Sequence, residues 1–90
     1  MQYEDKKDYF IKKVGELIKR IRKDRNKVSI SKIAPEYDID KSSWSKIERG
    51  FYSIELATAW KFAEALNIKF SEFIKILEDE LGEDFTLIDE

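Results

Sequence analysis

Apolar residues between positions 9 and 23 recur at intervals of three and four, and this spacing constrains the fold more than any other feature of the chain. It places six side chains on one face of an amphipathic helix: Phe10, Ile11, Val14, Leu17, Ile18 and Ile21. Similar spacings recur downstream, and the 90 residues include only one proline and three glycines to interrupt a helix. The sequence therefore predicts an all-α fold, a compact domain of five helices.

Two short helices are expected after a polar turn at residues 24–27. Ser29 is suited to cap the first of them, which contains Pro35. Asp40 is suited to cap the second, over residues 41–49, and Gly50 to end it. Between them the segment Asp38-Ile39-Asp40 forms a tight turn, because Asp tolerates the left-handed conformation better than most residues.

A fourth helix is expected over about residues 55–66 and a fifth over about 71–81. The apolar residues predicted to face inward from the fourth helix are Leu56, Ala59, Trp60, Ala63 and Leu66. Residues 85–88 form either a short strand or a loose tail. We expect one domain over residues 1–90, with the helix-turn-helix at about 29–50 and a dimerisation segment at 70–90.

The amino-acid composition argues against several classes of protein. The chain has no cysteine and no histidine, so it lacks thiolate metal ligands and the commonest general base, and we expect no enzyme, metal or cofactor. No apolar run approaches the roughly 20 residues of a membrane span, and no signal peptide is evident, which predicts a cytoplasmic protein without a membrane partner. The acidic run at 78–84 is expected to be a solvated face.

Charge is divided unevenly between the two halves of the chain. Residues 1–50 carry 14 Lys and Arg against 9 Asp and Glu, a net charge of +5. Residues 51–90 carry 3 against 10, a net charge of −7. This asymmetry indicates a basic face for a polyanion and an acidic part elsewhere.

The two short helices carry the functional prediction. Ala34 permits them to cross closely, Ile39 anchors the corner, and Trp44 and Ile47 point inward. The outer face of the second helix then presents small polar residues and lysines: Lys41, Ser42, Ser43, Ser45 and Lys46. Such a helix fits a B-DNA major groove about 12 Å wide, where Lys reaches guanine O6 and N7 and Ser bonds to any base edge.

These segments resemble the lambda-repressor/Cro-like (XRE) helix-turn-helix family. The similarity runs through residues 14–22, 29–34 and 39–50, and its most specific part is Ser-Trp-Ser-Lys-Ile-Glu-Arg-Gly at 43–50. It continues through Thr58 and residues 62–68, covering about 14–74 in all. The resemblance implies a five-helix DNA-binding domain that acts as a homodimer on a palindromic operator.

The resemblance also implies roles for individual residues. The base-reading positions fall on Lys41, Ser42, Ser43 and Lys46, and the phosphate-contacting positions near Ser29, Ser45, Arg49 and Tyr52. Tyr52 is expected to point outward and Phe51 inward. The family's structural ion pair corresponds to Arg22 with Glu48, and Lys23 is the alternative to Arg22.

The fifth helix and the tail are predicted to form the dimer surface, because a residual apolar stripe on a small domain often marks an interface. The residues of this surface are Phe70, Ile74, Leu77, Leu81, Phe85 and Leu87.

Three positions depart from the family pattern. Ile30 stands where a phosphate-binding Gln is usual, Asp38 where the turn has glycine, and Asp40 where the cap is neutral. The leading interpretation is a transcriptional regulator, a repressor, that binds double-stranded DNA sequence-specifically. The alternative is a protein-binding module, such as an antitoxin or antirepressor, that retains the fold and has a protein partner.

Overall fold

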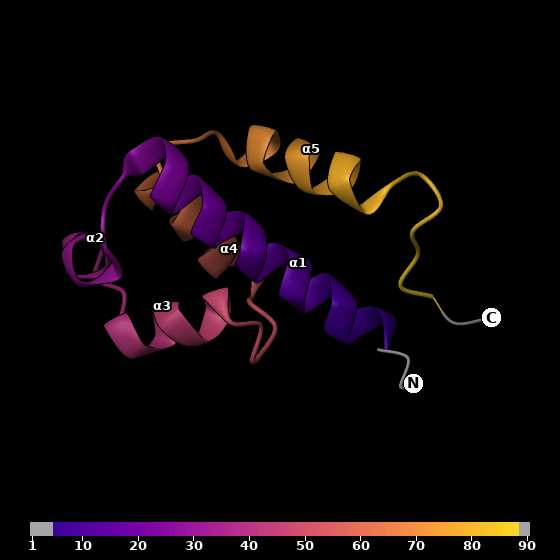
Figure 1. Cartoon of the computed structure of the whole chain (residues 1–90), viewed down its shortest axis with the longest axis horizontal. Coiled ribbons are helices and arrows are strands. Elements are labelled where there is room, and N and C mark those ends of the chain that lie inside the picture. Colours follow the sequence, from indigo (N-terminus) through magenta and orange to yellow (C-terminus); the bar gives the residue numbers. More distant parts are fainter. Residues whose placement is uncertain (1–4, 89–90) are drawn as a thin grey trace.

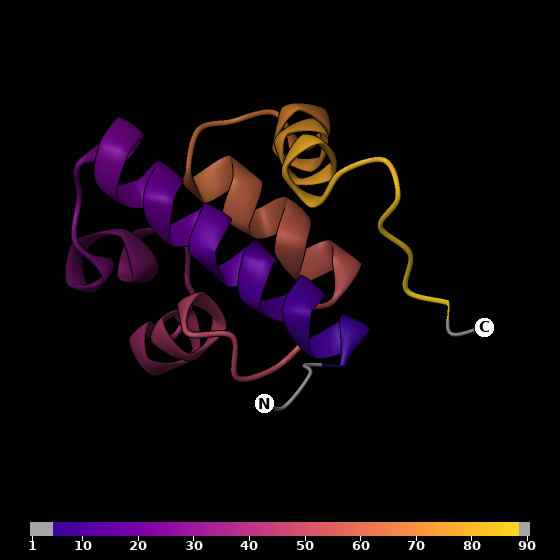
Figure 2. The ribbon, with the colours of Figure 1, turned by 45° about the vertical axis from the view of Figure 1, so that its right-hand side comes forward.

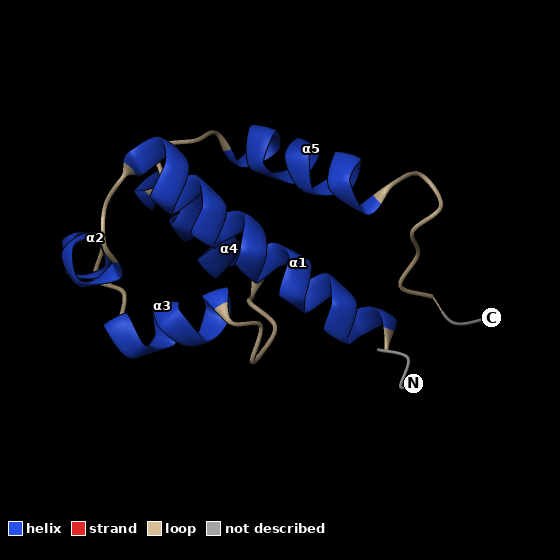
Figure 3. Cartoon of the chain, viewed as in Figure 1, coloured by secondary structure: helices blue, strands red, loops and turns tan. Residues whose placement is uncertain are grey.

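A computed structural model describes residues 5–88 of the chain. These residues form five α-helices and one π-helical turn, with no strand among them (Figure 3). The elements are α1 (Lys6–Ile21), η1 (Arg22–Asn26), α2 (Ile30–Glu36), α3 (Lys41–Glu48), α4 (Leu56–Ala65) and α5 (Phe70–Leu81). The predicted all-α class is confirmed. None of the described helices combines the length and apolar character that a membrane crossing requires.

Helix α1 runs through the middle of the molecule, with α5 along one side and α2 and α3 along the other (Figure 1). Helix α4 lies behind α1 and packs against α5, as the turned view shows (Figure 2). The recognition candidate α3 and the acidic helix α5 therefore lie on opposite sides of α1.

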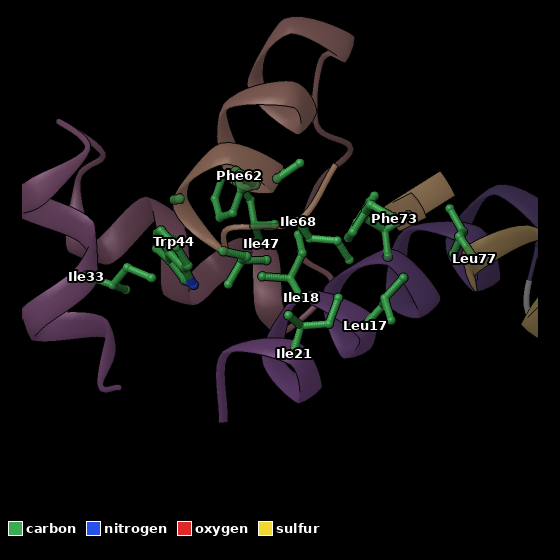
Figure 4. Close-up of a cluster of buried hydrophobic side chains, with 14 of the residues drawn as sticks. Leu17, Ile18, Ile21, Ile33, Trp44, Ile47, Phe62, Ile68, Phe73 and Leu77 are labelled. Atoms are coloured by element: carbon green, nitrogen blue, oxygen red, sulfur yellow. The ribbon is translucent and has the colours of Figure 1, made fainter. Parts of the chain in front are cut away.

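The core lies where α1, α3, α4 and α5 meet (Figure 4). Its largest fully buried side chains are Trp44, Phe62, Phe73, Leu17 and Ile18. Ala34 has no exposed surface, and this small residue lets α2 pack closely against α3. Four of the six side chains predicted for the apolar face of α1 are buried, while Phe10 and Ile11 are half-buried.

The predicted turn at 24–27 is largely helical instead. The chain continues from α1 into η1 and ends at Lys27, whose φ of 54° is left-handed. The backbone N–H groups of Lys27 and Val28 both point to the carbonyl of Arg22, the latter at 3.4 Å. Polar composition alone does not distinguish this helical extension from an open turn.

Pro35 lies inside α2 and does not break it. The helix ends one residue later, at Glu36, so the missing N–H of Pro35 removes one hydrogen bond from the last turn only. Ser29 caps the other end, where its Oγ accepts a hydrogen bond from the backbone N–H of Lys32 at 3.2 Å.

The face that helix α4 presents to the core only partly matches the predicted one. Leu56 is 73% exposed and Trp60 is 54% exposed, so the expectation that both face inward is wrong. Ala63 and Leu66 are buried as predicted, and Phe62 and Ala65 are buried as well. Apolar residues occupy nearly the whole circumference of this helix, and its packing against α5 decides which of them are covered.

Residues 85–88 form a tail that folds back towards α1. The ring of Phe85 stacks on Phe10, with centroids 6.0 Å apart, and lies 6.1 Å from the ring of Tyr9. Lys6 Nζ donates a hydrogen bond to the carbonyl of Ile88 at 3.0 Å. The tail is therefore anchored to the first turns of α1.

Candidate nucleic-acid interface

Helix α3 is capped at its first turn and buried along one side. Asp40 Oδ2 accepts a hydrogen bond from the backbone N–H of Ser43 at 3.1 Å, so the helix begins at Lys41. Trp44, Ile47 and Glu48 are buried and face the core. The opposite side of the helix is left to solvent, as a base-reading helix requires.

The turn before α3 has the geometry of a helix-turn-helix corner. Asp38 adopts a φ of 57°, a conformation that favours glycine and that Asp tolerates. The N–H of Ile39 donates to the carbonyl of Ala34 at 3.0 Å, and the side chain of Ile39 packs against the core. These contacts set the angle between α2 and α3.

The four predicted base-reading residues all lie on α3 and differ in exposure. Lys41, Ser42 and Lys46 are exposed, whereas Ser43 is half-buried. Within residues 5–88 no carboxylate pairs with Lys41 or Lys46. The hydroxyl of Ser43 lies 3.5 Å from Asp40 Oδ2, so it is partly engaged in the cap. Two lysines and one serine are thus the freest groups on this face.

Three of the four predicted phosphate-contacting residues lie outside residues 41–46, while Ser45 lies within α3 and is half-buried. Arg49 Nε lies 3.5 Å from the carbonyl of Ser45, and the Arg49 guanidinium sits 4.6 Å from the centre of the Phe51 ring. Tyr52 Oη lies 3.5 Å from the carbonyl of Ser43. Ser29 is exposed, and its Oγ keeps its own hydrogen to donate while it accepts the cap bond.

The prediction that Phe51 points inward is wrong. Its side chain is 61% exposed, more than that of Tyr52 at 41%. The ring lies under the guanidinium of Arg49 instead of under α4. Gly50, with a φ of 74°, turns the chain outward directly after α3.

A buried ion pair ties α3 to the end of α1. Arg22 Nε donates to Glu48 Oε2 at 2.7 Å and Arg22 Nη2 donates to Glu48 Oε1 at 2.9 Å. Trp44 Nε1 also donates to Glu48 Oε2, at 2.6 Å. The hydrogen bonds to Glu48, followed by its charge, raise the pKa of Arg22 above the usual value despite the opposing effect of burial. Arg22, and not Lys23, is the partner of Glu48.

The charge asymmetry of the sequence is also an asymmetry in space. The exposed cations Lys41, Lys46 and Arg49 lie on or directly after α3, whereas the acidic residues of α5 lie across α1 from it (Figure 1). Two of those acidic residues pair with α1 and η1: Glu80 with Arg20, and Glu72 with Arg25 at 3.5 Å. The acidic half therefore need not face a polyanion that approaches α3.

The packing of Ile30 accounts for the absence of the usual phosphate-binding Gln at this position. Its side chain is half-buried and packs against the core, so this position contributes to packing and offers no donor to a phosphate. Asp38 and Asp40, by contrast, are both exposed and add negative charge beside the reading surface.

The predicted dimer residues fall into three groups. Leu77 is 5% exposed and packs within the protomer, which corrects the expectation that it meets a partner. Leu81 and Phe85 are half-buried, Leu87 is half-exposed on the tail, and Phe85 stacks on α1. Phe70 and Ile74 remain partly open beside α4.

The exposure of two apolar residues, Leu56 and Trp60, was not predicted from the sequence. Leu56 and the Trp60 ring, which stacks on Phe70 with centroids 5.1 Å apart, extend the open apolar surface across α4. A cavity of about 210 Å³ is lined in part by Leu56, Phe70 and Ile74. The signal available in the sequence was a helix apolar on nearly all sides, which is typical of an element covered on two faces.

Comparisons with known proteins agree with this geometry. The helix-turn-helix family matches residues 18–73, more than half of the chain, from the last turn of α1 into α5. Control protein C.MunI from a Mycoplasma species is 30% identical over 66 residues, which cover 73% of this chain and 89% of that relative.

Proposed function

We propose that this chain, which belongs to the lambda-repressor/Cro-like (XRE) helix-turn-helix family of DNA-binding transcription regulators, binds a specific duplex sequence as a homodimer. The family consists of regulators and is generally not enzymatic. What supports sequence-specific reading is the exposed face of α3, where Lys41, Ser42 and Lys46 stand free of the core. We assign base reading to these three residues together with Ser43.

In this proposal α3 enters the major groove and the surrounding residues hold the phosphates. Arg49 directly follows α3, and Tyr52 Oη lies 3.5 Å from the carbonyl of Ser43 in its first turn, so we assign phosphate contacts to both. Ser29, the cap of α2, is assigned a third. Ser45 lies on α3 between the reading residues Ser43 and Lys46, and we assign it a further phosphate contact. Phosphate contacts of this kind fix the register of a protein on DNA, while contacts to base edges supply the sequence preference.

The dimer surface is proposed to centre on α4 and α5 and not on the tail. Leu56, Trp60, Phe70 and Ile74 form an apolar surface with projecting side chains beside a hollow of about 210 Å³. A two-fold dimer needs a surface that is complementary to itself, and a projection next to a hollow satisfies that requirement. We refer to these four residues as the α4–α5 surface.

Repression is proposed because a compact dimer that covers an operator excludes other proteins from the same stretch of duplex. The name of the relative, control protein, is consistent with a regulatory role. Because the ligand we propose for this chain is DNA, the protein must act in the compartment that holds this DNA. We propose that this compartment is the cytoplasm. Residues 1–90 are proposed to act as one domain, with residues 29–50 as the reading unit.

The test is selection from a random duplex library with the purified chain, followed by salt titration on the best binder. We expect a palindromic motif with half-sites about 34 Å apart, one helical turn. Replacing both Lys41 and Lys46 with Ala should abolish the motif. Replacing Lys69, the N-cap residue of α5, and Lys75 on α5 with Ala removes the same charge across α1 from α3 and should leave the motif intact.

A folded protein that enriches no motif at low salt would refute sequence-specific reading. The fold would then act as a scaffold for protein contacts, as in an antitoxin or antirepressor. Binding to DNA without a motif, with a log–log salt slope of about −0.9 for each phosphate neutralised, would indicate a non-specific binder.

A further inference from the structure

We infer that Trp44 is a positioning residue for sequence reading, because its indole N–H holds the carboxylate that orients α3. This inference rests on the proposed function, since it concerns how the reading helix is presented to DNA. It extends the site to a residue that touches no base and no phosphate.

The Glu48 carboxylate is held by three donors from two side chains. Its Oε2 accepts from Trp44 Nε1 at 2.6 Å and from Arg22 Nε at 2.7 Å, while its Oε1 accepts from Arg22 Nη2 at 2.9 Å. Trp44 has no exposed surface, and Arg22 and Glu48 are 8% and 7% exposed. In so dry a site each hydrogen bond is stronger than at the surface, and each missing one is more costly.

Contacts of these three residues reach four separate elements. Arg22 Nη1 donates to the carbonyl of Val28, directly before the Ser29 cap of α2, at 2.9 Å. The ring of Trp44 packs against Phe62 of α4 with centroids 4.4 Å apart (Figure 4). The network therefore joins the end of α1, the approach to α2, α3 and α4.

The network affects the reading of bases because it holds α3 from its inner face and so sets the orientation of the exposed residues. Trp44 and Glu48 are one turn apart on the inner face, whereas Lys41, Ser42 and Lys46 lie on exposed positions around them. A small rotation of α3 about its axis therefore moves every reading side chain together. Hydrogen bonds to base edges depend steeply on angle, while long cationic side chains follow a displaced phosphate. Loss of the network should lower specificity more than general affinity for DNA.

An exposed hydrogen bond of the same spacing serves as the control. Lys75 Nζ donates to Asp79 Oδ2 at 3.4 Å, across the same i to i+4 spacing on α5, and both side chains are exposed. Lys75→Met removes this donor without touching the buried network around Glu48.

The experiment replaces Trp44 with 3-benzothienylalanine, a bicyclic isostere that lacks the N–H donor, and separately tests Trp44→Phe. Each folded variant is titrated with the motif selected by the wild type and with a random duplex. We expect the ratio of specific to non-specific affinity to fall about tenfold, which is the order of discrimination lost when one base contact is misaligned. Affinity for random duplex should stay within about twofold, with an unchanged salt slope. Lys75→Met, which removes the exposed hydrogen bond to Asp79, should leave the ratio unchanged.

The outcomes separate this inference from the proposed function. A wild type that selects no motif overturns the proposed function, and this inference with it. A wild type that selects a motif, with a Trp44 isostere that keeps the full ratio, overturns the inference alone. Equal losses on specific and random duplex also overturn it, because they indicate a general loss of fold and not a change in how α3 is presented.

Discussion

Gly15 of α1 lies against the last turn of α3 so closely that a Cβ at this position would be 2.3 Å from the carbonyl oxygen of Ile47. The carbonyl oxygen of Glu48 would be 2.7 Å away. Both obstacles are backbone atoms, so no side-chain rotation relieves the clash. Gly15 thus allows α1 and α3 to approach at the point where the reading helix ends.

Gly15→Ala should therefore destabilise the protein, although Ala is the better helix former at an ordinary position. We expect the free energy of unfolding to fall by about 1–3 kcal/mol, the usual cost of overpacking. Urea denaturation followed by circular dichroism measures this change. Lys19→Ala, at an exposed position of the same helix, should have little effect. A gain in stability from Gly15→Ala would contradict the packing described here.

The Arg22–Glu48 pair should contribute far more to stability than the exposed pair between Arg25 and Glu72. Arg22→Met leaves a buried carboxylate without its cation, so we expect a loss of about 3–5 kcal/mol in the free energy of unfolding. Arg25→Met breaks a pair whose side chains are both about half-exposed, and it should cost less than about 1 kcal/mol. Equal losses for the two variants would refute this difference.

The dependence of this effect on pH follows from the raised pKa of Arg22. A cation with a raised folded-state pKa stabilises the protein fully below its unfolded-state pKa, and loses that effect only as the pH rises through the folded-state value. Both values lie far above neutrality for arginine. Arg22 itself should therefore contribute no pH dependence to the free energy of unfolding of the wild type from about pH 7 to pH 9, which urea denaturation at a series of pH values measures.

Asp40 should weaken general affinity for DNA while it stabilises α3. Asn caps a helix as well as Asp, so Asp40→Asn should keep the cap and remove one negative charge beside the reading face. We expect affinity for random duplex at low salt to rise about threefold, measured by fluorescence anisotropy. Glu83→Gln, which removes the same charge from the exposed tail, should not change that affinity. If Asp40→Asn and Glu83→Gln raise the affinity for random duplex equally, this affinity depends on the net charge of the protein and not on the position of Asp40.

The helix-turn-helix unit could be predicted because its signals are local. Ser29 and Asp40 each cap a helix within three residues of themselves, and Gly50 turns the chain directly after α3. The three-residue spacing of Trp44 and Ile47 places both on the inner face. Each of these features depends on neighbours in sequence, so a pattern of residue types is sufficient to find them.

The features that could not be predicted depend on distant partners. Phe85 packs on Phe10, 75 positions earlier, and no local pattern indicates that contact. Which apolar residues of α4 are buried depends on where α5 crosses it, so Leu56 and Trp60 were assigned to the wrong face. The choice of Arg22 over Lys23 depends on where α3 meets the end of α1, because Arg22 is buried against Glu48 while Lys23 is exposed.

The α4–α5 surface predicts which substitutions separate the protomers. Leu56→Glu places a charge at a side chain that is 73% exposed in the protomer and adjoins the hollow proposed for the partner. A charge buried without a counter-ion costs several kcal/mol. The Kd of the dimer should therefore rise by at least about a hundredfold. Leu87→Glu, at a tail residue that is 50% exposed, should leave the dimer intact. Sedimentation velocity across a concentration series measures both. If Leu87→Glu dissociates the dimer and Leu56→Glu does not, the tail is the interface and the α4–α5 surface serves another contact.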